Sequence, residues 1–313
     1  MKLVRMILSS LFCLALVYAA DGPARPKITG VAHVAFFTAD VAKTRAFYRD
    51  LLGYEEPYEL KNPDGSLSMA FVKINDRQYV ELSQEKEANS DRLNHVSIET
   101  DDIDGMRVYL ASKGVTVPAQ AGTVRIGNRA FNVKDPDGHT VEFVQYMPGG
   151  WTVHEKGKSV GSARVSDRMA HFGILVGNVN ASMKFYRDIL GFVETWRGAK
   201  DAARLDWINM RVPEGDDYIE FMLYSELPGQ TKRGSQHHIC LFVPDIEQAA
   251  KMIEERQASG VKYERPLEIK TGVNRKRQLN LFDPDGSRVE LMEPRTVDGK
   301  ATPSSSAPAP RGL

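Results

Sequence analysis

Cysteine is scarce in this sequence, and the scarcity limits how the chain can be stabilised. Only Cys13 and Cys240 occur among 313 residues. Cys13 lies in an N-terminal segment that we expect to be removed, so Cys240 would be the only cysteine of the mature protein. A single thiol excludes an intramolecular disulfide bond, and the fold must therefore be stabilised by packing.

A surplus of charge of either sign is also missing. The 41 basic and 41 acidic side chains cancel, and the formal net charge is zero. This balance gives no electrostatic reason to expect nucleic acid or an anionic membrane as a partner. We therefore predict a small-molecule substrate and no nucleic acid, and the composition leaves an oligomer possible.

The longest apolar run covers only residues 6–17, which is too short for a comfortable membrane-spanning helix. Lys2 and Arg5 precede the run, and small residues at Ala19 and Ala20 follow it. This order is typical of a cleaved signal peptide. We expect residues 1–20 to be removed and the mature protein to be periplasmic or secreted, with no membrane attachment; an uncleaved anchor is the alternative.

What the sequence does contain is a literal internal repeat. His33 and His171 each lie in an apolar segment that begins with alanine and histidine. The segment FYRDLLGY at 47–54 returns as FYRDILGF at 185–192, and the interval between these two segments equals the interval between the two histidines. A repeat of this kind indicates two copies of one structural plan.

The pattern of strands and helices divides the chain further into four similar units. Each unit begins with an apolar strand, continues as an amphipathic helix that ends at a glycine, and closes with three strands. We predict an α+β fold with two tandem domains, residues 29–148 and 167–294. Each domain would be a pair of βαβββ units that forms an open half-barrel cavity. Residues 149–166 would be a linker, and 295–313 a disordered tail rich in Thr, Pro, Ser and Ala.

This plan, the two FYRD segments and the Asp-Pro-Asp-Gly turns at 135–138 and 283–286 resemble the vicinal oxygen chelate superfamily. That group includes glyoxalase I, extradiol dioxygenases and bleomycin resistance proteins. The resemblance covers nearly all of the mature chain. In the metal-binding members the ligands lie on the first and last strands of each unit. The resemblance implies two ligand sets here, His33, Glu81, His95 and Glu142 in the first domain and His171, Glu220, His238 and Glu290 in the second.

Elementary chemistry supports a metal at these positions. A strand of a half-barrel points alternate residues into the cavity, and an ionisable group buried there needs a partner or a metal. Imidazole and carboxylate together suit Zn, Ni, Fe, Co or Mn, and we expect one divalent metal for each occupied site. A single strand histidine is more often an ordinary core residue. Four of the seven histidines, however, fall at these four equivalent positions.

The ligand set resembles that of glyoxalase I, which implies lyase or isomerase chemistry. In that enzyme a metal-bound glutamate moves a proton on the substrate. By position Glu142 or Glu290 would be the catalytic base, with Glu81 or Glu220 as the opposite partner. Strand parity adds Tyr224 as a possible acid or hydrogen-bond donor in a mostly apolar second pocket.

The chain departs from the pattern by which glyoxalases bind glutathione. Those enzymes carry an arginine four residues after the first ligand, where Phe37 and Leu175 stand here. They carry an asparagine four residues after the second ligand, where Glu85 and Tyr224 stand. Export would also separate the protein from cytosolic glutathione. We therefore predict an enzyme that is not specific for glutathione.

Two other functions fit parts of the sequence. An Fe(II) extradiol dioxygenase would use His171, His238 and Glu290, although Glu220 stands where that class has no ligand. A non-catalytic binding or resistance protein would need no metal. The pairing of the units is also open, since unit one could share its cavity with unit two or with unit four. The basic stretch 270–277 could bind an anionic group, although an exposed run of charge is more often a solvated loop.

Overall fold

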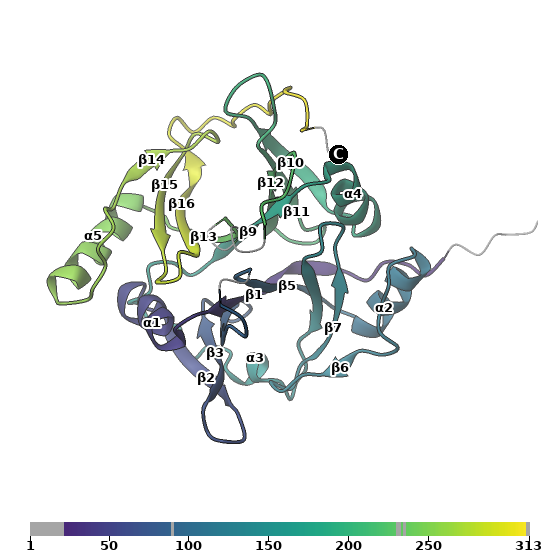
Figure 1. The fold of residues 1–313 in the computed structure, drawn as a ribbon, viewed down its shortest axis with the longest axis horizontal. Coiled ribbons are helices and arrows are strands. Elements are labelled where there is room, and N and C mark those ends of the chain that lie inside the picture. Colours follow the sequence, from purple (N-terminus) through teal and green to yellow (C-terminus); the bar gives the residue numbers. More distant parts are fainter. Residues whose placement is uncertain (1–21, 89–90, 230–232, 234–235, 311–313) are drawn as a thin grey trace, which may run out of the picture.

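Two eight-stranded sheets dominate the fold (Figure 1). The computed structural model describes residues 22–88, 91–229, 233 and 236–310, so the predicted signal peptide lies outside the described residues. The strands of the first sheet are β1 (Ile28–Thr38), β2 (Glu55–Lys61), β3 (Leu67–Lys73), β4 (Tyr79–Gln84), β5 (Leu93–Thr100), β6 (Gly122–Thr123), β7 (Arg129–Lys134) and β8 (Thr140–Gln145). Those of the second are β9 (Met169–Val176), β10 (Val193–Gly198), β11 (Trp207–Arg211), β12 (Tyr218–Leu223), β13 (His238–Phe242), β14 (Ile269–Thr271), β15 (Lys276–Phe282) and β16 (Arg288–Thr296).

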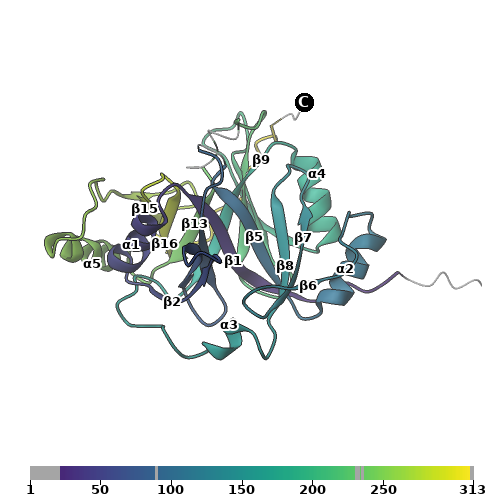
Figure 2. The same cartoon turned by 60° about the horizontal axis from the view of Figure 1, so that its bottom comes forward.

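The order of strands in the sheets answers the question of unit pairing. The first sheet runs β2-β3-β4-β1-β5-β8-β7-β6 and the second β10-β11-β12-β9-β13-β16-β15-β14. Antiparallel pairing of β1 with β5 therefore joins units one and two, and β9 with β13 joins units three and four. Each sheet curls into a half-barrel (Figure 2). The predicted α+β architecture of two tandem half-barrel domains is confirmed.

Few helices cover the sheets, and their ends follow local sequence signals. The helical segments are α1 (Val41–Ala46), the π-helical turn η1 (Phe47–Leu51), α2 (Ile103–Ser112), α3 (Trp151–His154), α4 (Val179–Met183), the π-helical turn η2 (Lys184–Ile189) and α5 (Ile246–Ala258). The Asp40 carboxylate accepts a hydrogen bond from the Lys43 amide and caps α1. Gly53 ends the same helical segment with φ +78°, a left-handed conformation that favours glycine. In the described residues no helix is long and apolar enough to cross a membrane.

The two repeated motifs meet across the domain interface. The Tyr186 hydroxyl, in η2 of the second domain, donates to Asp135 Oδ2 in the Asp-Pro-Asp-Gly turn of the first at 3.0 Å. In the reciprocal position, burial and then the Asp283 carboxyl raise the pKa of Tyr48 in η1 well above its ordinary value. Each turn of one domain therefore docks against the FYRD helix of the other. We call this pair of contacts the reciprocal turn–helix interface.

The second aspartate of each turn extends this interface. Asp137 accepts hydrogen bonds from the backbone amides of Gly177 and Asn178, and Asp285 accepts one from the amide of Ala39. Gly177 and Ala39 occupy corresponding positions of the repeat, so the two sets of contacts are equivalent. The helices of the two domains consequently lie beside each other, α1 near α5 and α2 near α4 (Figures 1 and 2).

Two segments predicted to be irregular make specific contacts in the structure. The segment 149–166 contains α3, whose buried Trp151 packs against Phe71 and Tyr79 of the first sheet. The segment after β16, for which the composition predicts disorder, lies along the second domain through its backbone. The Leu205 amide donates to the Pro308 carbonyl at 2.8 Å, and the Ser305 amide donates to the carbonyl of Arg197. These two hydrogen bonds link the described tail to the second domain, and disorder of 295–313 stays a prediction.

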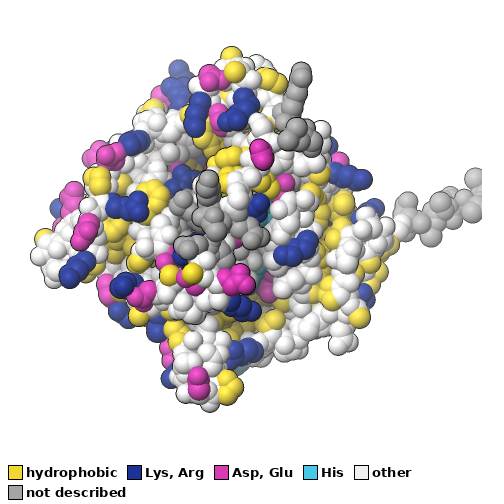
Figure 3. All heavy atoms as spheres, in the orientation of Figure 1, with side chains coloured by type: hydrophobic (Ala, Val, Ile, Leu, Met, Phe, Trp, Pro, Cys, Tyr) yellow, Lys and Arg dark blue, Asp and Glu magenta, His cyan; other side chains and the backbone are white. Residues whose placement is uncertain are grey.

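Basic and acidic side chains are interspersed over the molecular face shown in Figure 3. Neither sign gathers into a broad patch on that face, which is consistent with the balanced composition.

Candidate metal centre

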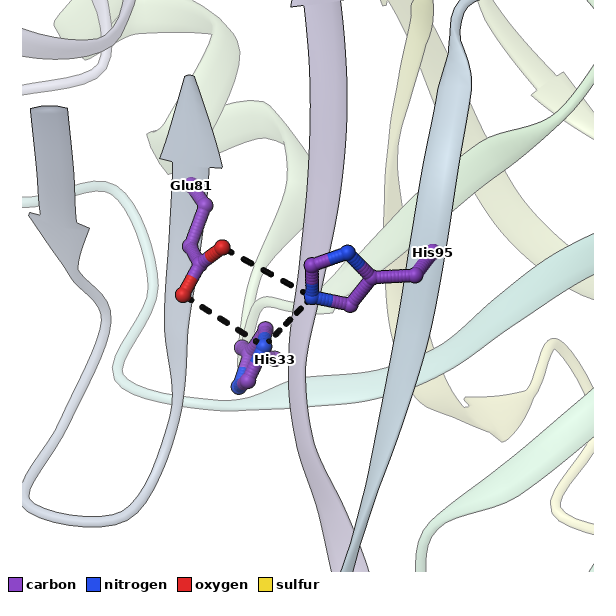
Figure 4. A group of neighbouring side chains, drawn as sticks. All are labelled: His33, Glu81 and His95. Atoms are coloured by element: carbon purple, nitrogen blue, oxygen red, sulfur yellow. Dashed lines mark hydrogen bonds and ion pairs between the residues drawn. The ribbon is translucent and has the colours of Figure 1, made fainter. Parts of the chain in front are cut away.

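The four central strands of the first sheet bring the four predicted ligands of that domain together. His33 lies on β1, Glu81 on β4, His95 on β5 and Glu142 on β8. Figure 4 shows the side chains of His33, Glu81 and His95 pointing toward one another from their three strands. All three residues are buried. Because alternate residues of a strand share a face, the ligand positions predicted from the repeat point into the same half-barrel.

The distances in this first-domain centre suit a single divalent ion. His33 Nε2 lies 2.9 Å from His95 Nε2, 3.5 Å from Glu81 Oε1 and 3.3 Å from Glu142 Oε1. His95 Nε2 lies 3.6 Å from Glu81 Oε2. Ligand atoms about 2.1 Å from a shared ion lie about 3 Å from each other, so these separations fit the donor set.

Burial shifts the pKa values of the ligands in this centre, so that the carboxyl groups tend to keep a proton and the imidazoles tend to stay neutral. A bound cation would favour the charged form of the carboxylates. Burial and then the neighbouring Glu142 raise the pKa of Glu81 well above its ordinary value. Burial also raises the pKa of Glu142 to about 7, against the opposing hydrogen bond from the Ser97 hydroxyl. Burial lowers the pKa of His95 to about 4, so its imidazole is neutral near pH 7. Two buried carboxyls beside two neutral imidazoles are the chemistry of a divalent metal site.

A cavity of about 340 Å³ opens from the first-domain centre. Its wall combines the four candidate ligands with apolar side chains, among them Met69, Phe71, Tyr79, Ile126 and Val144. The Tyr79 ring stacks on the His33 ring with centroids 4.4 Å apart and fixes its orientation. Trp151, in the segment between the domains, packs behind this wall against Tyr79. The sequence did not predict this contact, because the segment around Trp151 has no periodic pattern.

The second sheet repeats the arrangement with His171 on β9, Glu220 on β12, His238 on β13 and Glu290 on β16. His171 Nε2 lies 3.1 Å from His238 Nε2 and 3.5 Å from Glu290 Oε2, and His238 Nε2 lies 3.4 Å from Glu220 Oε2. Burial raises the pKa of Glu290 to about 7 and lowers that of His171 to about 3. The structure therefore brings all eight predicted ligands into two clusters.

One contact makes the second-domain centre different from the first. Arg288 Nη2 lies 2.6 Å from His238 Nδ1. A guanidinium can only donate a hydrogen bond, so Nδ1 accepts it. The Gln236 carbonyl, which could only accept, is farther from the same Nδ1 at 3.5 Å. The shorter contact therefore places the proton of the neutral imidazole on Nε2. That proton occupies the position from which His238 would bind a metal. The equivalent residue in the first domain is Thr140, and no cation contacts Nδ1 of His33 or His95 in the described part of the chain.

Two further differences separate the centres. Cys240 replaces Ser97 beside the last carboxylate, and its sulfur lies within 4.8 Å of a ring nitrogen of His171 and a carboxylate oxygen of Glu290. Gly173 replaces Ala35 opposite the second histidine of the pair. A Cβ at Gly173 would lie only 2.0 Å from His238 Cε1, so the glycine makes room for that ring.

Tyr224 is not part of either cluster. Its hydroxyl donates to Gln236 Oε1, and none of its contacts within the described residues reaches a candidate ligand. The expectation of a mostly apolar second pocket beside the ligands stays a prediction. A cavity of about 420 Å³ in the second half-barrel is lined by polar and basic groups, including Asn209, Asn274, Lys276 and Arg295, and by none of the four candidate ligands of that domain. Its lining includes residues of β10, β11, β12, β15 and β16 and of the segment after β16.

Comparison with known families agrees with this architecture. The model of the glyoxalase/bleomycin resistance protein/dioxygenase superfamily matches twice, at residues 30–143 and 168–291. The chain belongs to this superfamily. The two matches correspond to the two half-barrels, and each contains one of the two candidate metal centres.

The most informative relatives of this superfamily member are distant in sequence. A lactoylglutathione lyase of Arabidopsis thaliana is 23% identical over 276 residues, which is 83% of this chain and 90% of the relative. A lactoylglutathione lyase of Haemophilus influenzae is 27% identical over 123 residues, covering 37% of this chain and 91% of the relative. These relatives are named for action on a small molecule.

Solved structures share the fold at similarly low sequence identity. The Mn(II)-bound glyoxalase from Novosphingobium aromaticivorans superposes with a TM-score of 0.64 at 17% identity, covering 91% of this chain and 87% of that one. Homoprotocatechuate 2,3-dioxygenase from Brevibacterium fuscum, in its E323L mutant, superposes with a TM-score of 0.64 at 20% identity, covering 86% and 72%. Solved structures with this fold thus include a Mn(II)-bound glyoxalase and a ring-cleaving type of enzyme named as a dioxygenase.

Proposed function

We propose that this protein is a metal-dependent enzyme of the glyoxalase-like lyase or isomerase type, with the first-domain centre as its active site. Its substrate would be a small molecule with adjacent oxygens. The observation that carries the proposal is the convergence of His33, Glu81, His95 and Glu142 at the wall of one cavity. Similarity to several lactoylglutathione lyases supports the reaction class.

The four donors and Ser97 would have different roles in the reaction. The four donors would hold a divalent metal, which acts when bound as a Lewis acid on a substrate oxygen. Glu142 would take a proton from the carbon next to that oxygen and return it to the neighbouring carbon. In the protein without a metal, burial raises the pKa of Glu142 to about 7. A bound cation would favour the carboxylate form, which is the form that can act as a base. Ser97 positions Glu142 by donating a hydrogen bond to Oε1 at 2.9 Å.

The remaining cavity wall would select the substrate. Phe71, Ile126 and Val144 offer apolar contacts and exclude water from the reacting atoms. Phe37 stands where glutathione-specific glyoxalases carry an arginine, so a glutamyl carboxylate would find no cation there. We therefore propose a substrate without the glutathione moiety. The apolar N-terminal segment supports an exported protein, in the periplasm or outside the cell.

The dioxygenase alternative finds less support in the second-domain centre. That chemistry uses two histidines and one carboxylate. Here Arg288 occupies Nδ1 of His238, and Glu220 adds a second carboxylate 3.4 Å from His238 Nε2. A binding protein without a metal is opposed by the buried, converging donors of both domains.

Metal analysis combined with turnover tests the proposal. The protein lacking residues 1–20 should retain a divalent metal after purification and should isomerise hemithioacetals of small thiols faster than those of glutathione. The His33→Ala/His95→Ala variant should lose this activity, whereas the matched His171→Ala/His238→Ala variant should keep it. Oxygen uptake with a catechol, or activity that depends only on the second pair of histidines, would refute the proposal.

A further inference from the structure

A groove of about 600 Å³ lies along β7 on the outside of the first half-barrel, next to the second domain. The segment 114–118, which follows α2, forms one side, and β7 with the turn after it forms the other. Phe185 of η2 also lines the groove, so a ligand held there would contact both domains. None of the eight candidate metal ligands, all among the described residues, belongs to this lining. The groove is therefore separate from both metal centres.

The main chain of β7 is open toward this groove. Figure 1 shows β6 beside β7 at the end of the sheet, and in the described residues β6 pairs only with Arg129 and Ala130. Across the turn that follows β7, the Asp135 amide donates to the His139 carbonyl at 3.0 Å. Hydrogen-bonding residues alternate along an antiparallel pair, so the amide of the preceding residue, Lys134, points away from β8. Because Lys134 lines the groove, its N–H can donate to a ligand there.

The second domain carries a larger side chain at the equivalent of one groove residue. Gly114 and Gly260 follow the two helices α2 and α5. The third residue after each glycine is Val117 in the first domain and Tyr263 in the second. Both side chains are half-buried and pack against the hydrophobic core. A valine therefore stands in the first domain where the second domain has a phenol ring.

Tyr263 makes two contacts that define this position. Its hydroxyl accepts a hydrogen bond from the Phe282 amide at 3.1 Å. Its ring centroid lies 6.2 Å from that of Phe47. Phe282 and Phe47 correspond in the repeat to Lys134 and Phe185, and both of these line the groove of the first domain. The groove therefore presents the amide donor and the aromatic ring between which the second domain holds its own phenol.

We propose that the groove of the first domain binds a para-substituted phenol. The phenol oxygen would accept a hydrogen bond from the Lys134 N–H, as the Tyr263 oxygen accepts one from Phe282. The ring would lie against Val117 and Phe185, which offer apolar contacts. The groove is larger than one phenol ring, which leaves room for a substituent opposite the hydroxyl. This inference goes beyond the function proposed for the first-domain metal centre and does not depend on a bound metal.

Titration of the ¹⁵N-labelled protein with p-cresol, the analogue of a tyrosine side chain, tests this site. The Lys134 amide signal should shift with saturable binding, and toluene, which lacks the hydroxyl, should bind about three- to tenfold more weakly. Val117→Tyr supplies the ring from the chain itself and should abolish this binding. The matched variant Val108→Tyr adds a tyrosine at an exposed position of α2 and should leave the affinity unchanged.

The opposite substitution in the second domain gives an independent test. Tyr263→Ala should lower the melting temperature and should create a second site, so that the number of p-cresol molecules bound per chain rises by one. Because a ligand that binds only the folded state stabilises it, p-cresol should then raise the melting temperature of this variant more than that of the parent protein.

No binding of p-cresol, equal affinity for toluene, or equal binding by the Val117→Tyr and Val108→Tyr variants would overturn the proposal. A folded Tyr263→Ala variant that gains no second site would overturn it as well. The His33→Ala/His95→Ala variant should bind p-cresol as the parent protein does. Failure of the first-domain chemistry would therefore leave this result unchanged, and the two proposals can fail separately.

Discussion

The contact between Arg288 and His238 predicts that the two metal centres differ in affinity. For Nε2 of His238 to bind a metal, the imidazole must release the Arg288 guanidinium from Nδ1 so that the proton can move there. A hydrogen bond to a charged group is worth about 1.5–3 kcal/mol, which corresponds to about a 10- to 150-fold loss of affinity. The positive charge of Arg288 opposes a bound cation in the same direction. The first-domain centre has no such contact among the described residues and should bind first.

Replacing Arg288 with threonine, the residue found at the equivalent position 140, isolates this effect. The Arg288→Thr variant should bind its second metal about 10- to 150-fold more tightly than the parent protein, and the first metal equally well. Competition of apo-protein with a chromophoric chelator for Co²⁺ or Zn²⁺ measures both affinities. The His33→Ala variant assigns the tighter event to the first domain, because that event should disappear.

The reasoning would be refuted by two metals of equal affinity in the parent protein. It would also be refuted if Arg288→Thr left the weaker affinity unchanged while circular dichroism and melting temperature showed an intact fold. The reciprocal variant Thr140→Arg provides a further check, since a guanidinium next to His95 should weaken the tight event.

Three further predictions concern other residues. Glu142→Gln should lower kcat by about 10²- to 10⁴-fold while the bound metal is retained, and unchanged turnover would exclude Glu142 as the base. Gly173→Ala should abolish metal binding at the second centre only, because the added Cβ displaces His238; Ala35→Gly is the matched control, and metal counting distinguishes them. Burial raises the pKa of Asp283 from 3.8 to about 7, so the native carboxyl keeps its proton until pH approaches 7 and the parent protein loses stability as pH rises through that range. Asp283→Asn should therefore gain stability relative to the parent between pH 4 and 8, by up to about 4 kcal/mol in urea denaturation, and a pH-independent difference would contradict this.

The repeat carried most of the fold prediction because its signals are local. Asp40 and Gly53 mark the ends of a helix through their own backbone contacts, and the Asp-Pro-Asp-Gly segments are turns in any context. The choice of His33 and Glu81 as ligands came from the resemblance to the superfamily, and strand alternation within one unit is consistent with it. These features depend on residues that are neighbours in the sequence, so they can be predicted from the sequence alone.

The features that the sequence did not reveal depend on distant partners. The contact of Tyr186 with Asp135 joins residues of different domains, and the turn motif does not indicate its target. Arg288 lies two residues before Glu290 on the same strand and therefore shares its face, but only its register opposite His238 shows that it competes with a metal. The cavity of the second half-barrel combines Trp196 of unit three with Lys276 of unit four, and no periodic pattern links these two residues.

The reciprocal turn–helix interface has a consequence for the two halves of the chain. Each half carries both complementary parts, a turn and a helix that receives a turn, so a single half could associate with an identical copy through the same contacts. Because both halves belong to one polypeptide, a substitution changes one cavity and leaves its counterpart unchanged, as the contrast between Thr140 and Arg288 shows.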